Sequence, residues 1–261
     1  MQDNILEIKN LSKYFGGLAA VSSCSLKVKQ GTITGIIGPN GSGKSTLFNL
    51  IAGNLKSSAG NVLFNNENIT DIPSYELFSK GLLRTFQIAH EFTNLSVLEN
   101  LMMVPGNQSG EKLMNALLKP GLVAKEESQI KEKAMEVVDF LNLSHLKNEL
   151  AGNLSGGQKK LLELGRTMMV DAKLVLLDEV GAGVNRTLLK DLGTAIQKLN
   201  KEKGYTFCMI EHDMDFIGRL CDPVIVMAEG SVLFEGSVED AKKDERVIES
   251  YLGRGSKLKD N

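Results

Sequence analysis

The stretch "GPNGSGKST" at residues 38–46 constrains the fold of this 261-residue chain more than any other. It fits the pattern G-x-x-x-x-G-K-[ST], follows the apolar run "TITGII" at 32–37 and opens the helix-forming run "STLFNLIAG". A glycine-rich turn between a buried strand and a helix exposes consecutive backbone N–H groups, which bind phosphate. The stretch therefore predicts a phosphate-binding loop in a layered α/β fold, rather than an ordinary glycine turn that caps a helix.

Two side chains of this loop bring chemistry of their own. Lys44 can pair with the β- and γ-phosphate oxygens of a nucleotide, and the Ser45 hydroxyl can bind Mg²⁺. Consecutive backbone N–H groups can surround the β-phosphate. We therefore expect ATP contacts from Gly38, Pro39, Asn40, Gly41, Ser42, Gly43, Lys44, Ser45 and Thr46.

Other apolar runs predict the sheet that carries the loop. "KLVLLD" at 173–178, "YTFCMI" at 205–210 and "PVIVM" at 223–227 are continuously apolar, which is typical of parallel strands buried on both faces. Between the first two runs, apolar residues recur at the spacing of a helix that packs on a sheet: Leu188, Leu192, Ile196 and Leu199. These patterns predict an α/β fold, a P-loop NTPase core with a mainly parallel sheet.

Two further regions have different patterns. The N-terminal runs "ILEIKNL", "SSCSLKVKQG" and "GNVLFNNENI" are short, partly alternating and bounded by Gly16 and Gly17, Gly31 and Gly60, which predicts a small antiparallel β subdomain. From 97 to about 150 the pattern is helical, in "SVLENLMM" and "EESQIKEKAMEVVDFLNL", separated by a Gly/Pro-containing connector at 105–121. This pattern predicts an inserted helical subdomain.

We accordingly expect one domain over 4–253. Its core comprises 4–86 and 171–253, the helical subdomain lies at about 88–165, and 254–261 form a solvated tail.

The charge, apolar stretches and cysteines of the chain limit the partners and the location that we expect. Thirty Lys and Arg against 32 Asp and Glu give a formal charge of −2, so no nucleic-acid partner is expected. The N-terminus lacks a basic region followed by an apolar one, and no apolar stretch reaches the roughly 18 to 20 residues that cross a bilayer, which favours a cytoplasmic protein. Cys24, Cys208 and Cys221 are widely spaced among apolar residues, so we expect core residues rather than a disulfide or metal site.

Asp178 and Glu179 end the run "LVLLDE". At the carboxyl edge of a parallel sheet beside a phosphate loop, the first carboxylate can hold Mg²⁺ and the second can polarise an attacking water. Alone, this pair is more typical of a helix N-cap. Together with the loop at 38–46, it favours the catalytic interpretation.

A second glycine-rich junction, "LSGGQ" at 154–158, precedes the helix-forming run "KKLLELGRTMMV". Ser155 is a preferred N-cap residue, and Gly156 and Gly157 let backbone N–H groups approach a ligand closely. The junction therefore predicts a second anion-binding site.

With this signature the sequence resembles the ATP-binding cassette proteins over nearly its whole length. The resemblance implies that Gln87 in "RTFQ" contacts Mg²⁺ and the lytic water, and that His212 in "IEHD" lies at the γ-phosphate. Phe15 in "KYFGG", or neighbouring Tyr14, would stack on adenine. Taken singly, Gln87 is more typical of a surface residue, His212 of a strand end and Phe15 of a core, but their order and spacing favour the functional roles. His90 and His145 match no motif of the family.

The resemblance also explains why one chain has two such junctions. Cassette subunits pair head to tail, so Ser155, Gly156, Gly157 and Gln158 would cover ATP held by the phosphate loop of a second subunit, identical or related. "AGVN" at 182–185 resembles the D-loop of the family. Val180 and Arg186 stand where the family usually has proline, which leaves the backbone there less constrained, because proline fixes φ near about −65°.

Three segments resemble the ATP-binding subunits of branched-chain amino acid importers: "GLLRTFQIAHEFTNLSVLENLMM", the connector at 105–130 and "EGSVEDAKKDERVIESYLG". This resemblance implies an ATPase on the cytoplasmic face of the membrane that energises integral membrane permease subunits. The apolar stretch "FTNLSVLENLMM" predicts docking of a permease around 88–104, and the alternative is that Phe92, Leu95 and Leu98 pack inside the helical subdomain. Members of the subfamily also serve urea, other small amino acids and amides. The alternatives are a soluble ATPase acting on nucleic acid or ribosomes, and a non-hydrolysing regulator, against which Glu179 and His212 argue.

Overall fold

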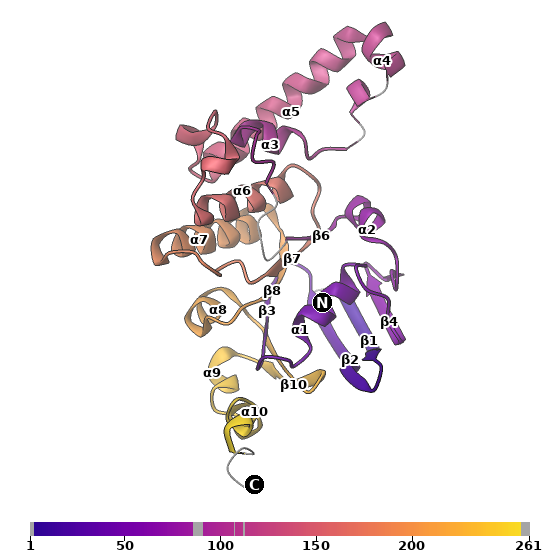
Figure 1. The fold of residues 1–261 in the computed structure, drawn as a ribbon, viewed down its shortest axis with the longest axis vertical. Coiled ribbons are helices and arrows are strands. Elements are labelled where there is room, and N and C mark those ends of the chain that lie inside the picture. Colours follow the sequence, from indigo (N-terminus) through magenta and orange to yellow (C-terminus); the bar gives the residue numbers. More distant parts are fainter. Residues whose placement is uncertain (1–2, 86–90, 107, 112, 257–261) are drawn as a thin grey trace. The chain divides into compact units, whose positions relative to one another are not determined.

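The computed structural model describes residues 3–85, 91–106, 108–111 and 113–256. The chain divides into two compact units, the first formed by 1–87, 173–182 and 196–261, and the second by 88–172 and 183–195. The second unit thus starts at the residue where the helical subdomain was expected, continues beyond 165 and takes in a later segment. Figure 1 gives the order of the elements along the chain.

The first unit contains the expected parallel sheet. Within the described residues, its strand order is β10-β9-β3-β8-β7-β6. The strands are β3 (Ile33–Ile37), β6 (Leu82–Arg84), β7 (Leu174–Asp178), β8 (Thr206–Ile210), β9 (Val224–Ala228) and β10 (Ser231–Gly236). All neighbouring pairs are parallel except β9 with β10. Every residue of β3, β7 and β8 is buried, which confirms the interpretation of the continuous apolar runs.

A second, antiparallel sheet in the same unit has the order β2-β1-β4-β5 in the described residues. Its strands are β1 (Asn4–Phe15), β2 (Leu18–Lys29), β4 (Ala59–Phe64) and β5 (Glu67–Asn68). The antiparallel arrangement was predicted, and β4 and β5 are short, but the expectation of short strands was wrong for β1 and β2, which each have 12 residues. Gly16 and Gly17 form the turn of this hairpin, and register shifts along the pair let the long strands bend. Gly60 lies inside β4, not at its boundary.

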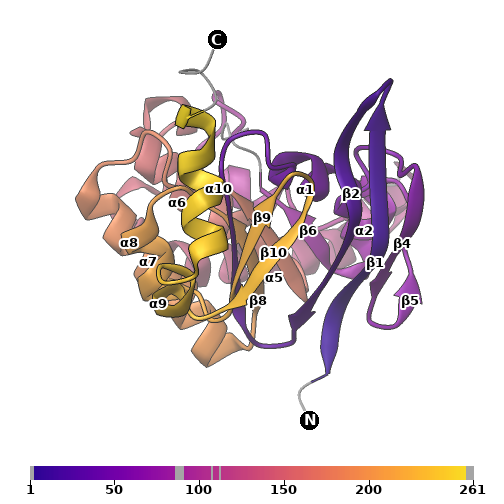
Figure 2. The same ribbon diagram turned by 90° about the horizontal axis from the view of Figure 1, so that it is seen from below.

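Helix α1 (Lys44–Ile51) packs into a core shared by the two sheets, and Figure 2 shows it between them. Leu47, Phe48 and Ile51 are at most 1% exposed, alongside Leu6 and Ile8 of β1. Burying such side chains contributes about 1.5–3 kcal/mol each. This packing fixes the helix whose first turn contributes Lys44 to the phosphate loop.

The other helices of the first unit either connect two strands or follow the last strand, β10. They are α2 (Ser74–Lys80), α8 (Met214–Leu220), α9 (Val238–Ala241) and α10 (Glu245–Ser256). Helix α10 contacts β10 and lies beside β9 and β10 in Figure 2. The helix continues to Ser256, so it includes the first residues of the expected tail, and 257–261 lie outside the described residues.

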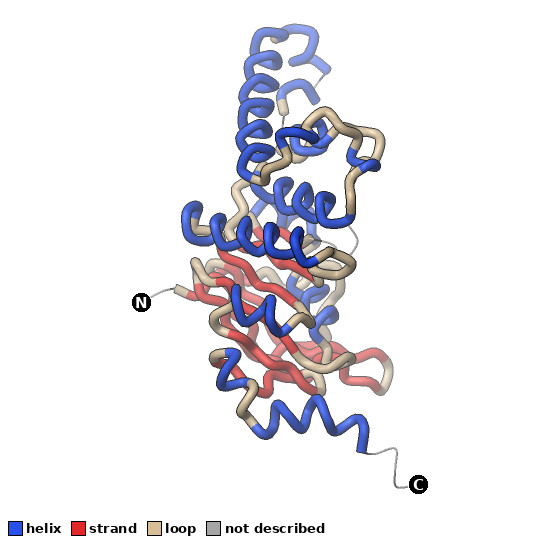
Figure 3. The backbone as a smooth tube through the Cα atoms, turned by 90° about the vertical axis from the view of Figure 1, so that its left-hand side faces the viewer, coloured by secondary structure: helices blue, strands red, loops and turns tan. Residues whose placement is uncertain are grey.

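The second unit is helical in its described residues, and helices are drawn in blue in Figure 3. Its elements are α3 (Val97–Met102), η1 (Ser109–Glu111), α4 (Leu113–Leu118), α5 (Pro120–Phe140), η2 (Ser144–Leu146), η3 (Ala151–Asn153) and α6 (Gly156–Met168). Helices α3, α5 and α6 pack on one another. The connector between the two predicted helices contains α4, and α5 begins at Pro120, since proline is favoured in the first turn of a helix.

Helix α7 (Arg186–Lys203) contains residues of both units. Leu192, Ile196 and Leu199 are buried and Leu188 is half-buried, as the helical spacing predicted, and Leu189 is also buried. Cys24, Cys208 and Cys221 are buried free thiols, which confirms their interpretation as core residues. In the described part of the chain, no helix has the length and apolar character needed to cross a membrane.

Candidate nucleotide-binding site

The loop between β3 and α1 has a backbone that only glycine tolerates at two positions. Gly38 has φ +147°, and a Cβ there would lie 2.1 Å from the Met227 carbonyl oxygen. Gly43 has φ +84°, and a Cβ there would lie 2.0 Å from the Ala20 carbonyl oxygen. Both positions would clash with fixed backbone, so the sequence determines the path of the loop. Gly43 is the N-cap of α1 and offers no side-chain cap, which leaves the first N–H groups of the helix to a ligand.

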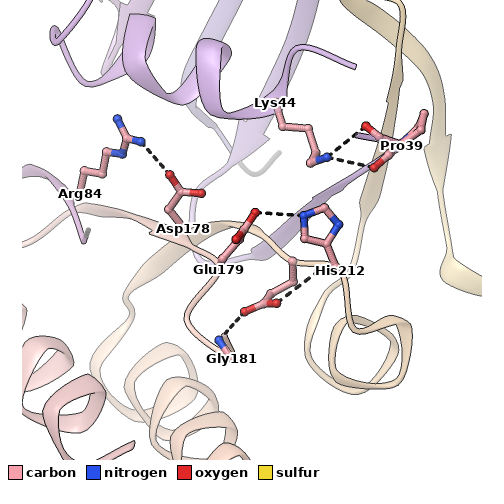
Figure 4. Close-up of polar contacts among 9 residues, drawn as sticks. Pro39, Lys44, Arg84, Asp178, Glu179, Gly181 and His212 are labelled. Carbon is pink, nitrogen blue, oxygen red and sulfur yellow. Dashed lines mark hydrogen bonds and ion pairs between the residues drawn. The ribbon is translucent and has the colours of Figure 1, made fainter. Parts of the chain in front are cut away.

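Lys44 is folded onto this loop. Its Nζ donates to the carbonyl oxygens of Gly38 at 2.9 Å and Pro39 at 3.4 Å, as Figure 4 shows. Burial lowers the pKa of the Lys44 ammonium, whereas the carboxylates of Glu179 and Asp178 raise it. A lysine held inside the loop and facing two carboxylates is placed to pair with an anion bound there.

Asp178 ends β7 and forms an ion pair with Arg84 at the end of β6, at 2.7 Å (Figure 4). A second nitrogen of Arg84 donates to Asn49 Oδ1 of α1 at 2.6 Å. The guanidinium therefore connects the Asp178 carboxylate to the helix that follows the phosphate loop. Arg84 was not predicted from the sequence, where its signal was a cation at the end of a short apolar run.

Glu179 and His212 meet at the carboxyl ends of β7 and β8. Glu179 Oε1 lies 3.0 Å from His212 Nε2, and the Glu179 backbone has φ +47° (Figure 4). The two side chains are 21% and 47% exposed, so both can reach a molecule in solvent. The structure thus brings together two residues that are 33 positions apart in the sequence.

Glu211, next to His212, is the second residue that sequence reasoning missed. Its side chain is buried at 5% exposure, and Oε1 accepts the Gly181 N–H at 2.7 Å. Oε2 accepts the N–H of His212 at 3.3 Å. Burial raises the pKa of this carboxyl, and the hydrogen bonds from Gly181 and His212 lower it. Its signal in the sequence was an acidic residue directly after a continuously apolar strand.

Of the other residues predicted for this site, some lie in the described part of the chain and others lie outside it. Tyr14 and Phe15 end β1 and are each 49% exposed, which excludes the alternative of a core aromatic at Phe15, and its stacking on adenine stays a prediction. Lys13 Nζ lies 5.2 Å from the centre of the Phe15 ring. Either ring is accessible to a purine, and the choice between them stays open. Gln87 and His90 lie outside the described residues, and His145 is exposed on η2.

The "LSGGQ" stretch at 154–158, called the signature junction below, lies in the second unit. Ser155 caps α6 there, as predicted. The Ser155 Oγ accepts the Gln158 N–H at 3.4 Å, and Gln158 Oε1 accepts the Ser155 N–H at 2.9 Å, which forms a capping box. A Cβ at Gly157 would lie 2.5 Å from Leu188 Cδ1 of α7, so close packing requires this glycine. A Cβ at Gly156 would have the Gly183 carbonyl oxygen 3.8 Å away as its nearest neighbour. Of the two glycines, Gly156 is therefore the one that a ligand can approach closely.

This chain is similar to known proteins. The family model described as ABC transporter matches residues 21–182. An Archaeoglobus fulgidus protein named "probable branched-chain amino acid transport ATP-binding protein" is 43% identical over 249 residues, covering 95% of each chain. A Pseudomonas aeruginosa protein named as a high-affinity branched-chain amino acid transport ATP-binding protein is 34% identical and covers 97% of this chain and 99% of its own.

A solved structure described as the ADP conformation of an ATP-binding cassette of an ABC transporter has a TM-score of 0.81 to this chain. It is 40% identical, and the match covers 96% of this chain and 99% of that one. The likeness therefore extends over the whole described fold and not over the phosphate loop alone.

Proposed function

This chain belongs to the ABC transporter family, and from that premise we propose that it is the ATP-hydrolysing subunit of an importer for branched-chain or related small amino acids. The names and high coverage of the relatives support this substrate class. The observation that carries the proposal is the meeting of Lys44, Glu179 and His212 at one edge of the parallel sheet. Phosphoryl transfer to water needs this set: a cation for the phosphates, a base, and a polar group beside it.

The phosphates of ATP occupy the loop from Gly38 to Thr46. Its backbone leaves no room for side chains at Gly38 and Gly43, and such a cradle fits a group whose oxygens accept N–H bonds. Lys44 exchanges the two loop carbonyls for phosphate oxygens, a stronger pairing because both partners are charged. The adenine stacks on Phe15 or Tyr14, whose exposed rings end β1.

Mg²⁺ fits the oxygen groups that flank the loop. Ser45 is exposed in the first turn of α1, and Asp178 ends strand β7, which β8 separates from β3 in the sheet. The described residues contain no cluster of three His, Cys, Asp or Glu that could hold an ion by themselves. Mg²⁺ typically takes one or two protein oxygens, with water and phosphate completing its shell, so Ser45, Asp178 and Gln87 are suitable ligands. When bound, the ion neutralises charge on the transferred phosphoryl group.

Glu179 acts as general base. Its carboxylate is partly exposed and 3.0 Å from His212 Nε2, so the histidine can hold it toward an attacking water and contact the γ-phosphate. Gln87 completes the set as a ligand of the lytic water. Hydrolysis then removes the γ-phosphate, which the phosphate loop of one subunit and the "LSGGQ" junction of the other would both contact.

The second junction acts on the nucleotide of another subunit. Helix α6 begins at Gly156, and the start of a helix carries about half a positive charge, which favours an added phosphate. We assign Ser155, Gly156, Gly157 and Gln158 to the γ-phosphate of a second cassette subunit, identical or related. ATP thereby joins the subunits, and hydrolysis lets them separate.

The permease docks around 88–104, at the cytoplasmic face of the membrane. Phe92 and Met103 are 47% and 54% exposed, whereas Leu95 and Leu98 are half-buried. Exposed apolar groups favour a partner there. The Arg166 guanidinium lies 5.6 Å from the centre of the Phe92 ring, which favours the alternative that this segment packs only within its own unit. Cysteines at 92 or 95 should cross-link to a permease loop, and an active complex without any cross-link contradicts docking here.

A transport assay tests the proposed function. The chain is purified with its permease subunits, placed in vesicles with the cognate binding protein, and supplied with ATP and labelled leucine, urea or a small amide. ATP-dependent leucine uptake is the expected result. Uptake of urea or an amide alone identifies the alternative importer of the same subfamily. ATPase activity that responds to nucleic acid or ribosomes, with no permease recovered, identifies the soluble alternative.

A further inference from the structure

We propose that Glu211 is a positioning residue for ATP hydrolysis: its buried carboxylate ties the turn after Glu179 to the backbone of His212 and so fixes the two side chains toward each other. This inference rests on the proposed ATPase activity. It assigns Glu211 no contact with the nucleotide.

The two hydrogen bonds of Glu211 come from different segments of the chain. Oε1 accepts the N–H of Gly181, two residues after Glu179, at 2.7 Å. Oε2 accepts the His212 N–H at 3.3 Å. Because Glu179 and His212 also contact each other at 3.0 Å, the contacts form a closed ring through both loops (Figure 4). A carboxylate inside such a ring restrains the relative position of its members.

The turn after Glu179 needs an external restraint. The Glu179 backbone has φ +47°, a region that residues other than glycine rarely adopt. The Ala182 N–H donates to the Glu179 carbonyl at 3.1 Å, which closes a four-residue turn with Val180 at its second position. Proline at that position would fix φ, but valine does not. Glu211 supplies the missing restraint one residue later, at Gly181.

The chemistry of the side chain matters as much as its position. A carboxylate has only acceptors, so its two oxygens can satisfy two N–H groups at once. A glutamine offers one acceptor oxygen and an NH₂ group, which would face an N–H donor. An alanine offers neither. We therefore expect Glu211→Gln to impair the geometry and Glu211→Ala to impair it further.

The primary test measures steady-state ATP hydrolysis and MgATP affinity for the wild type, Glu211→Gln and Glu211→Ala, in the complete chain. We expect kcat to fall by about 10-fold in Glu211→Gln and by about 100-fold in Glu211→Ala, since small displacements of catalytic groups have costs of this order. The Kd for MgATP, measured by calorimetry, should stay within about twofold, because Glu211 does not touch the phosphates. Unchanged kcat in both variants overturns the proposal.

Glu126→Gln is the matched control. The Glu126 carboxylate on α5 likewise accepts a backbone N–H, that of Ser109 at 2.8 Å, but it lies outside both catalytic loops. Its kcat should equal that of the wild type. If kcat falls equally in Glu126→Gln and Glu211→Gln at equal loss of thermal stability, Glu211 has a structural role only, and the proposal fails.

A second change separates positioning from stability. Val180→Pro fixes the turn by itself, and the Val180 N–H donates to no backbone carbonyl in the described part of the chain, so proline removes no such bond. In the Glu211→Ala background it should restore kcat at least severalfold, more than it changes kcat in the wild type. Absence of recovery in a folded double variant contradicts the role of the turn. A wild-type chain without ATPase activity would refute the proposed function, whereas active Glu211 variants refute only this inference.

Discussion

The phosphate loop and the signature junction are both glycine-rich starts of helices, yet they are built differently. At Gly38 and Gly43 a Cβ would overlap backbone carbonyl oxygens, and Gly43 gives α1 no side-chain cap. At the signature junction, Ser155 and Gln158 cap α6 with their own side chains. The first junction thus leaves its N–H groups to a ligand, and the second satisfies part of its own.

The difference fits the proposal that two anion sites share one nucleotide. The phosphate loop also holds Lys44, which donates to its carbonyls, so it can bind a triphosphate by itself. Within the described residues, the start of α6 has no counterpart of Lys44 folded onto its loop. It offers a ligand mainly the helix dipole and the open approach at Gly156. We therefore expect the first site to determine affinity and the second to respond to the γ-phosphate.

The largest effect is expected at the base beside the phosphate loop. Glu179→Gln keeps the size of the side chain but removes its charge, and loss of a general base typically slows a reaction by about 10²- to 10⁴-fold. ATP should still bind. The measurement is phosphate release under saturating MgATP, with nucleotide binding as the control. Hydrolysis at the wild-type rate would exclude Glu179 as the base.

The second prediction concerns the pairing of subunits in the Glu179→Gln background. Trapped ATP should give a dimer by size exclusion, whereas ADP gives a monomer. Adding Ser155→Arg places a bulky side chain at the signature junction, which should abolish the dimer without abolishing ATP binding. An ATP-dependent dimer that survives Ser155→Arg would show that the second junction does not act on the nucleotide of the other subunit. If the natural partner is a related cassette, the same experiment is run with both chains.

Removing the cation from the first junction should have the next largest effect. Lys44→Ala is expected to weaken MgATP binding by roughly 10- to 100-fold, since a hydrogen bond to a charged group contributes about 1.5–3 kcal/mol. The fold should persist, because the hydrogen bonds of the Lys44 ammonium group within the described residues go to carbonyls of its own loop. Calorimetry measures the affinity, and Lys56→Ala, whose side chain is outside the loop, is the control. Equal affinities in mutant and wild type would contradict the assignment of this loop.

The smallest effect distinguishes the two glycines of the signature. Gly157→Ala should destabilise the chain by about 1–3 kcal/mol, because the new Cβ would lie 2.5 Å from Leu188 Cδ1. Gly156→Ala, whose nearest neighbour lies 3.8 Å away, should leave thermal stability nearly unchanged. Leu188→Ala should relieve part of the penalty at Gly157 in a double-mutant cycle. Equal stability losses at the two glycines would contradict the packing role of Gly157.

Much of the fold and site could be predicted because their signals are local. The buried strands β3, β7 and β8 appear as continuous apolar runs, since both faces of a central parallel strand are covered. Ser155 was predicted as an N-cap because serine is preferred at that position and a helix-forming run follows directly. The expectation of short N-terminal strands failed because bulges let β1 and β2 continue through breaks in their alternation.

By itself, the sequence determined the phosphate loop, the parallel core and the family, because each depends on the order of residues within short segments. Tertiary structure alone decided the partners of Arg84, Gly157 and Glu211. Arg84 pairs with Asp178 across 94 positions, and Glu211 binds the N–H of Gly181 across 30. Such contacts follow from the order and register of the strands, and no local pattern specifies which two loop ends the folded sheet brings together.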